Sequence, residues 1–309
     1  MSGSKLTRRA LLARSAVTAV VGVAGAGCST LLGGGEAETD VFTRWLPAPT
    51  AVTNTDHYRF DYYDLATLGA QREHLGGEPT VFERTWEPVG LAWDDATAVV
   101  TVGSVDVVTA EFDRDGAVSD LEAAGYDRAG EYKGYVRYRN GETGTVFALT
   151  DGTLLVASVD RFAADAVAPT ERLETVVGAA TGDVDRYAEA NEDIRAVVEE
   201  LGRATLVSAR TLEESDAAGP RSGRFENLVA EGTRSVVDGE RVAEKWVYVY
   251  ERPRDVDTAA LEAYVQASDN SSAEVDQPFV AVDDISYTTE GRKGIITGTR
   301  DAGEYYDDA

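Results

Sequence analysis

Cysteine, histidine and lysine are all scarce in this 309-residue chain, and each shortage removes a class of structure or chemistry. The only cysteine is Cys28, so no disulfide can form within the chain. The two histidines, His57 and His74, lack the short fixed spacing of a metal motif, and we expect them in structural or surface roles. The sequence therefore predicts no metal site and no cofactor. Lysine occurs four times, so arginine supplies almost all of the positive charge.

Motifs for catalysis and nucleotide binding are missing as well. The sequence has no Gly-x-Ser-x-Gly elbow, no P-loop and no Gly-x-Gly-x-x-Gly after a strand. Asp113-x-Asp115-Gly116 and Asp183-x-Asp185 imitate part of a calcium loop, but the other ligands and the closing glutamate are absent. A turn that caps the following helix explains the first pair fully. We expect no catalytic residue and a protein that is not an enzyme.

Positive charge is in short supply relative to negative charge. Asp and Glu number 55 against 29 Lys and Arg, which gives a formal net charge of −26. Residues 1–27 hold four of the cations and no acid, so the rest of the chain carries about −30. Such self-repulsion weakens a compact fold in dilute buffer, whereas at 1 M salt the Debye length falls to about 3 Å. With no basic patch to neutralise phosphates, we expect no nucleic-acid partner.

The N-terminus combines three features in a meaningful order. Arg8 and Arg9 form a twin-arginine pair, and a short apolar run at 16–26 follows, too short to cross a bilayer of roughly 30 Å. Small residues then lead directly into Cys28. This order is typical of a signal peptide whose removal exposes a cysteine for lipid attachment. The glycine-rich, acidic segment that follows, to about residue 38, predicts a flexible tether.

The first 35 residues or so resemble the leader of a Tat-exported lipoprotein, and the acidic, lysine-poor composition resembles the proteins of halophilic archaea. The body is similar to uncharacterised surface lipoproteins of those organisms. That similarity is carried by the leader, the charge and the stretch Phe112-Asp113 … Gly125-Tyr126 … Tyr132-Lys133-Gly134-Tyr135. The resemblance implies lipid on Cys28 and a lipid-anchored location at the extracellular face of the cell membrane. It implies no activity.

One further feature suits an exported chain. Asn270-Ser271-Ser272 is an N-glycosylation sequon within a polar stretch. Such tripeptides also arise by chance, so an occupied and an unoccupied Asn270 both fit the sequence.

The body predicts an α+β fold in which antiparallel sheets carry helices on one face. Turns at Asn140-Gly141 and Asp151-Gly152 are strong hairpin signals. Strands are predicted at 57–63, 89–93, 96–102, 105–112, 132–138, 145–149, 153–158, 204–211, 225–229, 241–250, 279–289 and 293–298. Helices are predicted at 65–73, 117–124, 163–167, 170–180, 191–202 and 258–267.

The order of these elements suggests an internal repeat. Both halves read as strand pair, helix and strand pair, and Leu-Glu-Ala recurs at 121–123 and 261–263. The two halves are either two related β-β-α-β-β units or unrelated segments whose elements follow the same order by coincidence, and the sequence leaves both alternatives open. The predicted organisation is a signal peptide at 1–27 and a lipidated cysteine with its linker at 28–40. Two α+β units follow, at 41–190 and 191–300, and an acidic tail at 301–309.

Three functions remain. The first is a non-enzymatic envelope module that binds a protein or a surface polymer, or maintains the surface layer. The second is a substrate-binding lipoprotein of a transporter, although a two-lobed receptor would show strand–helix alternation where hairpins dominate here. The third is a hydrolase with two opposed carboxylates in a cleft. The sequence favours the first, because it offers an anchor and a strand-rich body without a catalytic motif.

Overall fold

A computed structural model of the protein describes residues 36–52, 57–75, 86–159, 167–213, 225–269 and 278–304. The predicted sites at Arg8, Arg9, Cys28 and Asn270 lie outside these residues, as does all of the predicted helix at 163–167 except its last position. No helix in the described part of the chain is both long and apolar enough to cross a membrane.

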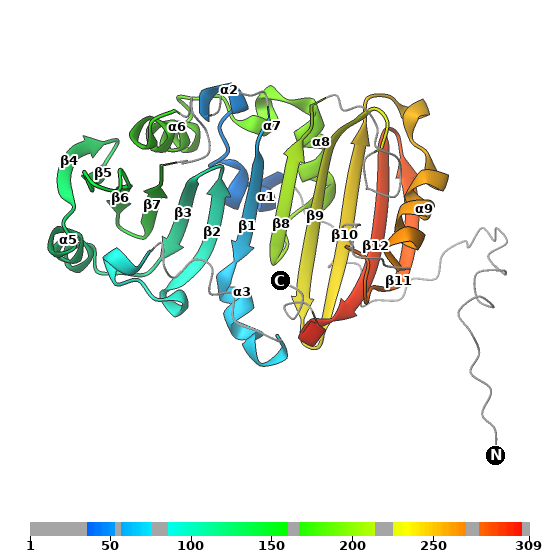
Figure 1. Ribbon diagram of the computed structural model, residues 1–309, viewed down its shortest axis with the longest axis horizontal. Helices are drawn as coiled ribbons and strands as arrows, with labels where there is room; N and C mark the ends of the chain where they lie inside the picture. The colour runs from blue at the N-terminus through cyan, green and yellow to red at the C-terminus, as the bar shows by residue number, and fades with distance from the viewer. Residues whose placement is uncertain are drawn as a thin grey trace, which may run out of the picture. The chain divides into compact units, whose positions relative to one another are not determined.

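The described strands form one antiparallel sheet of 12 strands, so the predicted α+β class is confirmed (Figure 1). Across the sheet the order is β11-β12-β10-β9-β8-β1-β2-β3-β7-β6-β5-β4. The strands of the first half are β1 (Arg59–Asp64), β2 (Ala96–Val102), β3 (Val105–Ala110), β4 (Asp127–Tyr132), β5 (Tyr135–Arg139), β6 (Val146–Thr150) and β7 (Thr153–Ala157). Those of the second half are β8 (Leu206–Thr211), β9 (Leu228–Asp238), β10 (Arg241–Tyr250), β11 (Asp283–Glu290) and β12 (Lys293–Asp301).

The two halves begin with the same arrangement of strands and meet at their first strands. β1 and β8 pair antiparallel at the centre of the sheet. In each half three strands form a meander, a helix follows, and the last strand returns to pair with the third: β7 with β3, and β12 with β10. The helices Arg114–Ala123 and Thr258–Asp269 are thus each preceded by three strands, where a strand pair was expected. Four strands follow the helix in the first half and two follow it in the second, where a pair was expected in both.

The helices lie on both faces of this sheet. They are α1 (Glu36–Thr43), α2 (Pro49–Val52), α3 (Leu65–Ala70), α5 (Arg114–Ala123), α6 (Pro169–Thr181), α7 (Tyr187–Ala190), α8 (Glu192–Leu201) and α9 (Thr258–Asp269). One core joins α1, α6, α7 and α8 to the face that carries Phe60 and Val247. On the other face, α3 and α5 pack over the first half, and α9 packs over the outer strands of the second. Helices on one face were expected, but strands such as β6, β7 and β10 bury both sides and need cover on both.

The local sequence explains α8, which covers the centre of the sheet. Its apolar residues Ile194, Val197, Val198 and Leu201 recur at helical spacing and are all buried. Asn191 caps its N-terminus, since its side-chain oxygen accepts hydrogen bonds from the backbone N–H groups of Asp193 and Ile194.

Gly232 on β9 lets α8 approach the sheet closely. A Cβ atom at that position would lie 2.6 Å from Val197 and 2.8 Å from Leu201. Any larger residue would push the helix away from the strands.

Several predicted boundaries were wrong, for local reasons. The segment 89–93 is not a strand: its two end residues belong to the 3₁₀ turns Glu87–Val89 and Trp93–Asp95, and Gly90 has a φ of +65°. The predicted strand 132–138 is a hairpin, because Lys133 and Gly134 both have positive φ and turn β4 into β5. β9 runs to Asp238, well beyond the predicted end at 229.

Both ends of the body are more ordered than predicted. α1 begins at Glu36, inside the range assigned to the linker, because Phe42 is fully buried in the core and fixes the helix. At the other end Ala302, predicted as acidic tail, is also fully buried. The folded body therefore includes α1 and Ala302, which were assigned to the linker and the tail.

Candidate functional site

Charged and polar side chains gather at the centre of the sheet, on the face that α8 does not cover. Strand pairing aligns them in two rows, because directly opposed residues point to the same side. One row is Arg59, Arg210 and Glu231, on β1, β8 and β9. The other is Asp106, Thr101, Asp61, Ser208 and Thr233, on β3, β2, β1, β8 and β9. We call these eight side chains the central polar face.

The central polar face lies between two apolar regions. On the same side of the sheet, one is the core under α3 and α5, and the other is the core under α9. The intervening residues of β1 and β8, such as Phe60 and Val207, point to the α8 side and are buried. Within the described part of the chain no helix packs over the central polar face, and Arg59, Arg210 and Thr233 are exposed. This face is therefore the candidate binding surface.

Two ion pairs fix the arginines of this face. Arg59 contacts Oδ1 of Asp61 through Nε at 3.0 Å and Nη2 at 2.9 Å. Arg210 contacts Oε1 of Glu231 through Nε at 2.8 Å and Nη2 at 2.5 Å. Two N–H groups on one edge of the guanidinium hold each carboxylate, so each side chain has a defined orientation. The acids are the more buried partners, at 20% and 21% exposed.

A pocket of about 200 Å³ opens between this face and the core under α9. Arg59, Arg210, Glu231 and Thr233 line one side of it. The other side is apolar and aromatic, formed by Trp246, Tyr248, Tyr264 and Pro278. Pockets that bind small molecules commonly combine an apolar wall with a few convergent polar groups.

Asp106 is the most perturbed carboxyl of the central polar face. Its side chain accepts a hydrogen bond of 2.9 Å from the Thr101 hydroxyl. Burial raises the pKa of Asp106 to about 6, and the hydrogen bond from Thr101 opposes that rise only in part. No second carboxylate lies opposite it in the register: its neighbours there are Thr101 and Val156.

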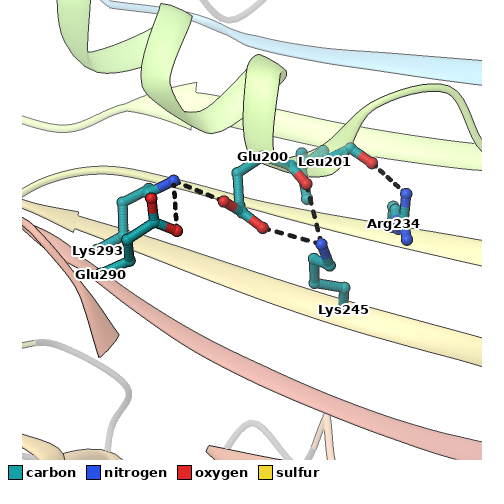
Figure 2. Close-up of polar contacts among 6 residues, drawn as sticks. All are labelled: Glu200, Leu201, Arg234, Lys245, Glu290 and Lys293. Carbon is teal, nitrogen blue, oxygen red and sulfur yellow. Dashed lines mark hydrogen bonds and ion pairs between the residues drawn. The ribbon is translucent and has the colours of Figure 1, made fainter. Parts of the chain in front are cut away.

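A separate charged cluster lies on the opposite face, under the end of α8 (Figure 2). The Glu200 carboxylate stands between Lys245, at 2.9 Å, and Lys293, at 2.6 Å. Lys245 also donates to the Glu200 carbonyl at 3.1 Å, and Arg234 donates to the Leu201 carbonyl at 2.5 Å. Cations at the C-terminus of a helix satisfy its last carbonyls and its dipole. The cluster therefore docks α8 on the sheet and is structural.

The residues singled out from the sequence are not brought together. His57 lies 3.6 Å from Glu213, and His74 lies 3.6 Å from Glu73. Asp113 caps α5, accepting a hydrogen bond of 3.2 Å from the N–H of Asp115. The described residues contain no group of three or more His, Cys, Asp or Glu that could hold a metal ion.

The second aspartate pair also meets protein donors. Asp183 accepts a hydrogen bond of 2.7 Å from the Thr181 hydroxyl and forms an ion pair with Lys133. Asp185 is exposed, and its carbonyl accepts the N–H of Ala48. These contacts give the pair a place in the fold without a bound ion.

The central polar face was not identified from the sequence, although part of its signal is there. On β1 the polar residues Arg59 and Asp61 alternate with Phe60 and Tyr62. This is the pattern of a strand with one solvent-exposed face and one buried face. The pairing of β1 with β8 crosses about 150 positions of sequence and leaves no local trace.

The chain matches no protein-family model and no curated protein. Among solved structures it is similar to crystal forms III and I of TP0453, with TM-scores of 0.48 and 0.45. Sequence identity is 11% in both, over 83% of this chain and 94% and 93% of those chains. A similarity this distant says nothing about what either protein binds.

Proposed function

We propose that this protein is an extracytoplasmic lipoprotein, anchored to the membrane through Cys28, that works as a non-enzymatic binding module. The observation that carries the binding role is the central polar face, with its oriented arginines beside a partly aromatic pocket. The leader of the sequence supports the anchor and the export. Its partner would be an envelope protein or a surface polymer.

The other two functions receive less support. A two-lobed substrate receptor would divide its strands between two sheets around a cleft, whereas all described strands join a single sheet. A carboxylate-based hydrolase needs two opposed acids across a cleft. Among the described residues the pocket is lined by one acid, Glu231, and Arg210 neutralises it.

Site-specific crosslinking in intact cells tests the binding role. A photoreactive residue at Thr233 would report on the central polar face, because Thr233 is exposed within it. The matched control is the same residue at Glu199, which is exposed on α8, on the other side of the sheet. At native salt we expect one dominant crosslinked species from position 233. The same species should not form from position 199. Equal patterns from both positions, or none from either, would refute a macromolecular partner for this face.

The anchor is tested separately by Cys28→Ser. The variant should appear in the medium or remain unprocessed, while Ser29→Ala should be retained on the membrane as the unaltered protein is. Mass spectrometry of the N-terminal peptide would show the lipid directly. Membrane retention of Cys28→Ser, with no lipid mass on the unaltered protein, would remove the lipoprotein proposal.

A further inference from the structure

Two arginines of the central polar face stand directly opposite each other. Arg59 on β1 is the register partner of Arg210 on β8, so both side chains leave the sheet on the same side. Like charges directly opposite on neighbouring strands destabilise a sheet. Each of the two cations is offset by a carboxylate of its own, Asp61 for Arg59 and Glu231 for Arg210.

Each arginine is oriented by its carboxylate and retains free donors. Arg59 and Arg210 both use Nε and Nη2 for their acids, as described above. A guanidinium has five N–H donors, two of them on Nη1. Within the described part of the chain, Nη1 of neither arginine makes a hydrogen bond or an ion pair. Two oriented guanidinium groups with free Nη1 donors are suited to a carboxylate.

The same pocket offers an acceptor next to these donors. Glu231 contacts Arg210 through Oε1 alone, which leaves Oε2 for a ligand hydroxyl. The hydroxyl of Thr233 can both donate and accept. Among the described residues, two cations and one anion line the pocket, and a second anion, Asp61, is paired with Arg59 beside it. The rest of the lining includes three aromatic side chains, Trp246, Tyr248 and Tyr264, together with Ser208, Ala209, Gly232 and Pro278.

The size of the pocket restricts the ligand. A pocket of about 200 Å³ has room for a small molecule only. One ring with its substituents fills such a space. An aromatic wall packs well against the apolar face of a ring, and the polar side would hold its substituents.

We propose that this pocket binds an acidic sugar, or another small polyhydroxylated carboxylate. The carboxylate lies between Nη1 of Arg59 and Nη1 of Arg210, a hydroxyl donates to Oε2 of Glu231, and the ring packs against Trp246 and Tyr248. The inference rests on the proposed binding function and deepens it by naming the ligand class. An acidic surface polymer would present such a group as one of its units.

The test is a titration of the purified protein at 2 M KCl with glucuronate and galacturonate, each against its neutral counterpart, glucose or galactose. Ligand-observed NMR detects the weak binding expected for a single sugar unit. We expect at least one acid to bind saturably, and its neutral counterpart to bind at least tenfold more weakly.

Two variants locate the site. Arg59→Gln and Arg210→Gln should each weaken binding of the acid about tenfold or more. The control is Arg139→Gln on β5, an exposed arginine that makes no ion pair with the described residues, and it should bind as the unaltered protein does. Unchanged melting temperatures would show that the variants are folded.

Equal binding of acidic and neutral sugars, binding of neither acid, or binding that survives both substitutions would overturn the inference. Its failure can be told apart from failure of the proposed function. A dominant crosslinked partner at position 233 without sugar-acid binding keeps the binding module and removes the ligand class. If the sugar acid binds but no partner is crosslinked, the ligand class proposed for the pocket stands and the proposed macromolecular partner does not.

Discussion

Single residues decide how the central polar face responds to pH, and Asp106 is the strongest case. Burial raises the pKa of its carboxyl to about 6, above the ordinary value near 4. The folded state therefore prefers the protonated form. Asp106 adds stability fully below about pH 4, and this contribution is lost as the pH rises through about 6.

Asp106→Asn should consequently stabilise the protein at pH 7, by about 1 to 2 kcal/mol, since each pKa unit is worth about 1.4 kcal/mol and the group is partly solvated. The asparagine keeps an oxygen for the Thr101 hydroxyl. Urea denaturation at several pH values measures the effect. Asp127→Asn, at an exposed position, controls for the loss of one negative charge. A variant that gains nothing over this control at pH 7 would mean that Asp106 is not perturbed by burial.

Glu200 shows the opposite behaviour on the other face. Burial would raise its pKa, but hydrogen bonds from Lys293 and Lys245 outweigh burial and hold the pKa below the ordinary value. Glu200→Ala leaves Lys245, whose side chain is 9% exposed, without its carboxylate. We expect a loss of about 3 kcal/mol at pH 7. The neighbouring Glu199→Ala, at an exposed position, should cost less than about 0.5 kcal/mol.

The pH dependence gives this prediction a second readout. Because the folded pKa of Glu200 is lowered, its contribution is present above the ordinary glutamate value and is lost as the pH falls through the folded one. The difference between Glu200→Ala and the unaltered protein should shrink below about pH 4. A difference that stays constant with pH would assign the loss to packing instead of charge.

At the scale of elements, α1 tests where the folded body begins. Phe42 is fully buried and lies against Phe60 and Tyr62, with ring centroids 5.8 and 5.1 Å away. Phe42→Ala should cost about 3 to 5 kcal/mol in urea denaturation. Asp40 lies in the same helix as Phe42. Asp40→Asn removes only its exposed ion pair with Arg186, so it should cost less than about 1 kcal/mol. Similar small losses for both would mean that α1 is part of the tether after all.

The elements that the sequence predicted well are those with local causes. The hairpin at Asp151-Gly152 was found because glycine in the turn is a local signal. Lys133-Gly134 was missed because a lysine with positive φ looks like any strand residue. The predicted strand ended before the true end of β9 because Gly232 weakens the strand pattern. A glycine is needed there because α8 approaches the sheet closely, and this tertiary contact leaves no local signal.

The candidate site was harder to predict than the fold. Arg59 and Arg210 are unremarkable in their own strands, each paired with an acid close by in space. Their significance comes from the register between β1 and β8, which brings the two halves of the chain together. Hydrophobic alternation shows which face each residue occupies, but it does not show which strands become neighbours.

At the scale of the whole molecule, net charge should control stability through salt. With a formal charge of −26, repulsion between acids opposes the compact state until ions screen it. The Debye length falls from about 10 Å at 0.1 M salt to about 3 Å at 1 M. The melting temperature should therefore rise by about 5 °C or more between 0.1 and 1 M KCl, and only slowly thereafter.

A charge-reduced variant separates screening from the general exclusion of salt from protein surfaces, which stabilises any fold. Asp127→Asn, Glu199→Gln and Glu240→Gln together remove three exposed acids that form no ion pair with the described residues. If repulsion is the cause, this variant melts higher than the unaltered protein at 0.1 M KCl and the two converge at 2 M. Parallel curves that never converge would assign the salt effect to exclusion, and a flat melting temperature in both would show that the acidic surface does not limit stability.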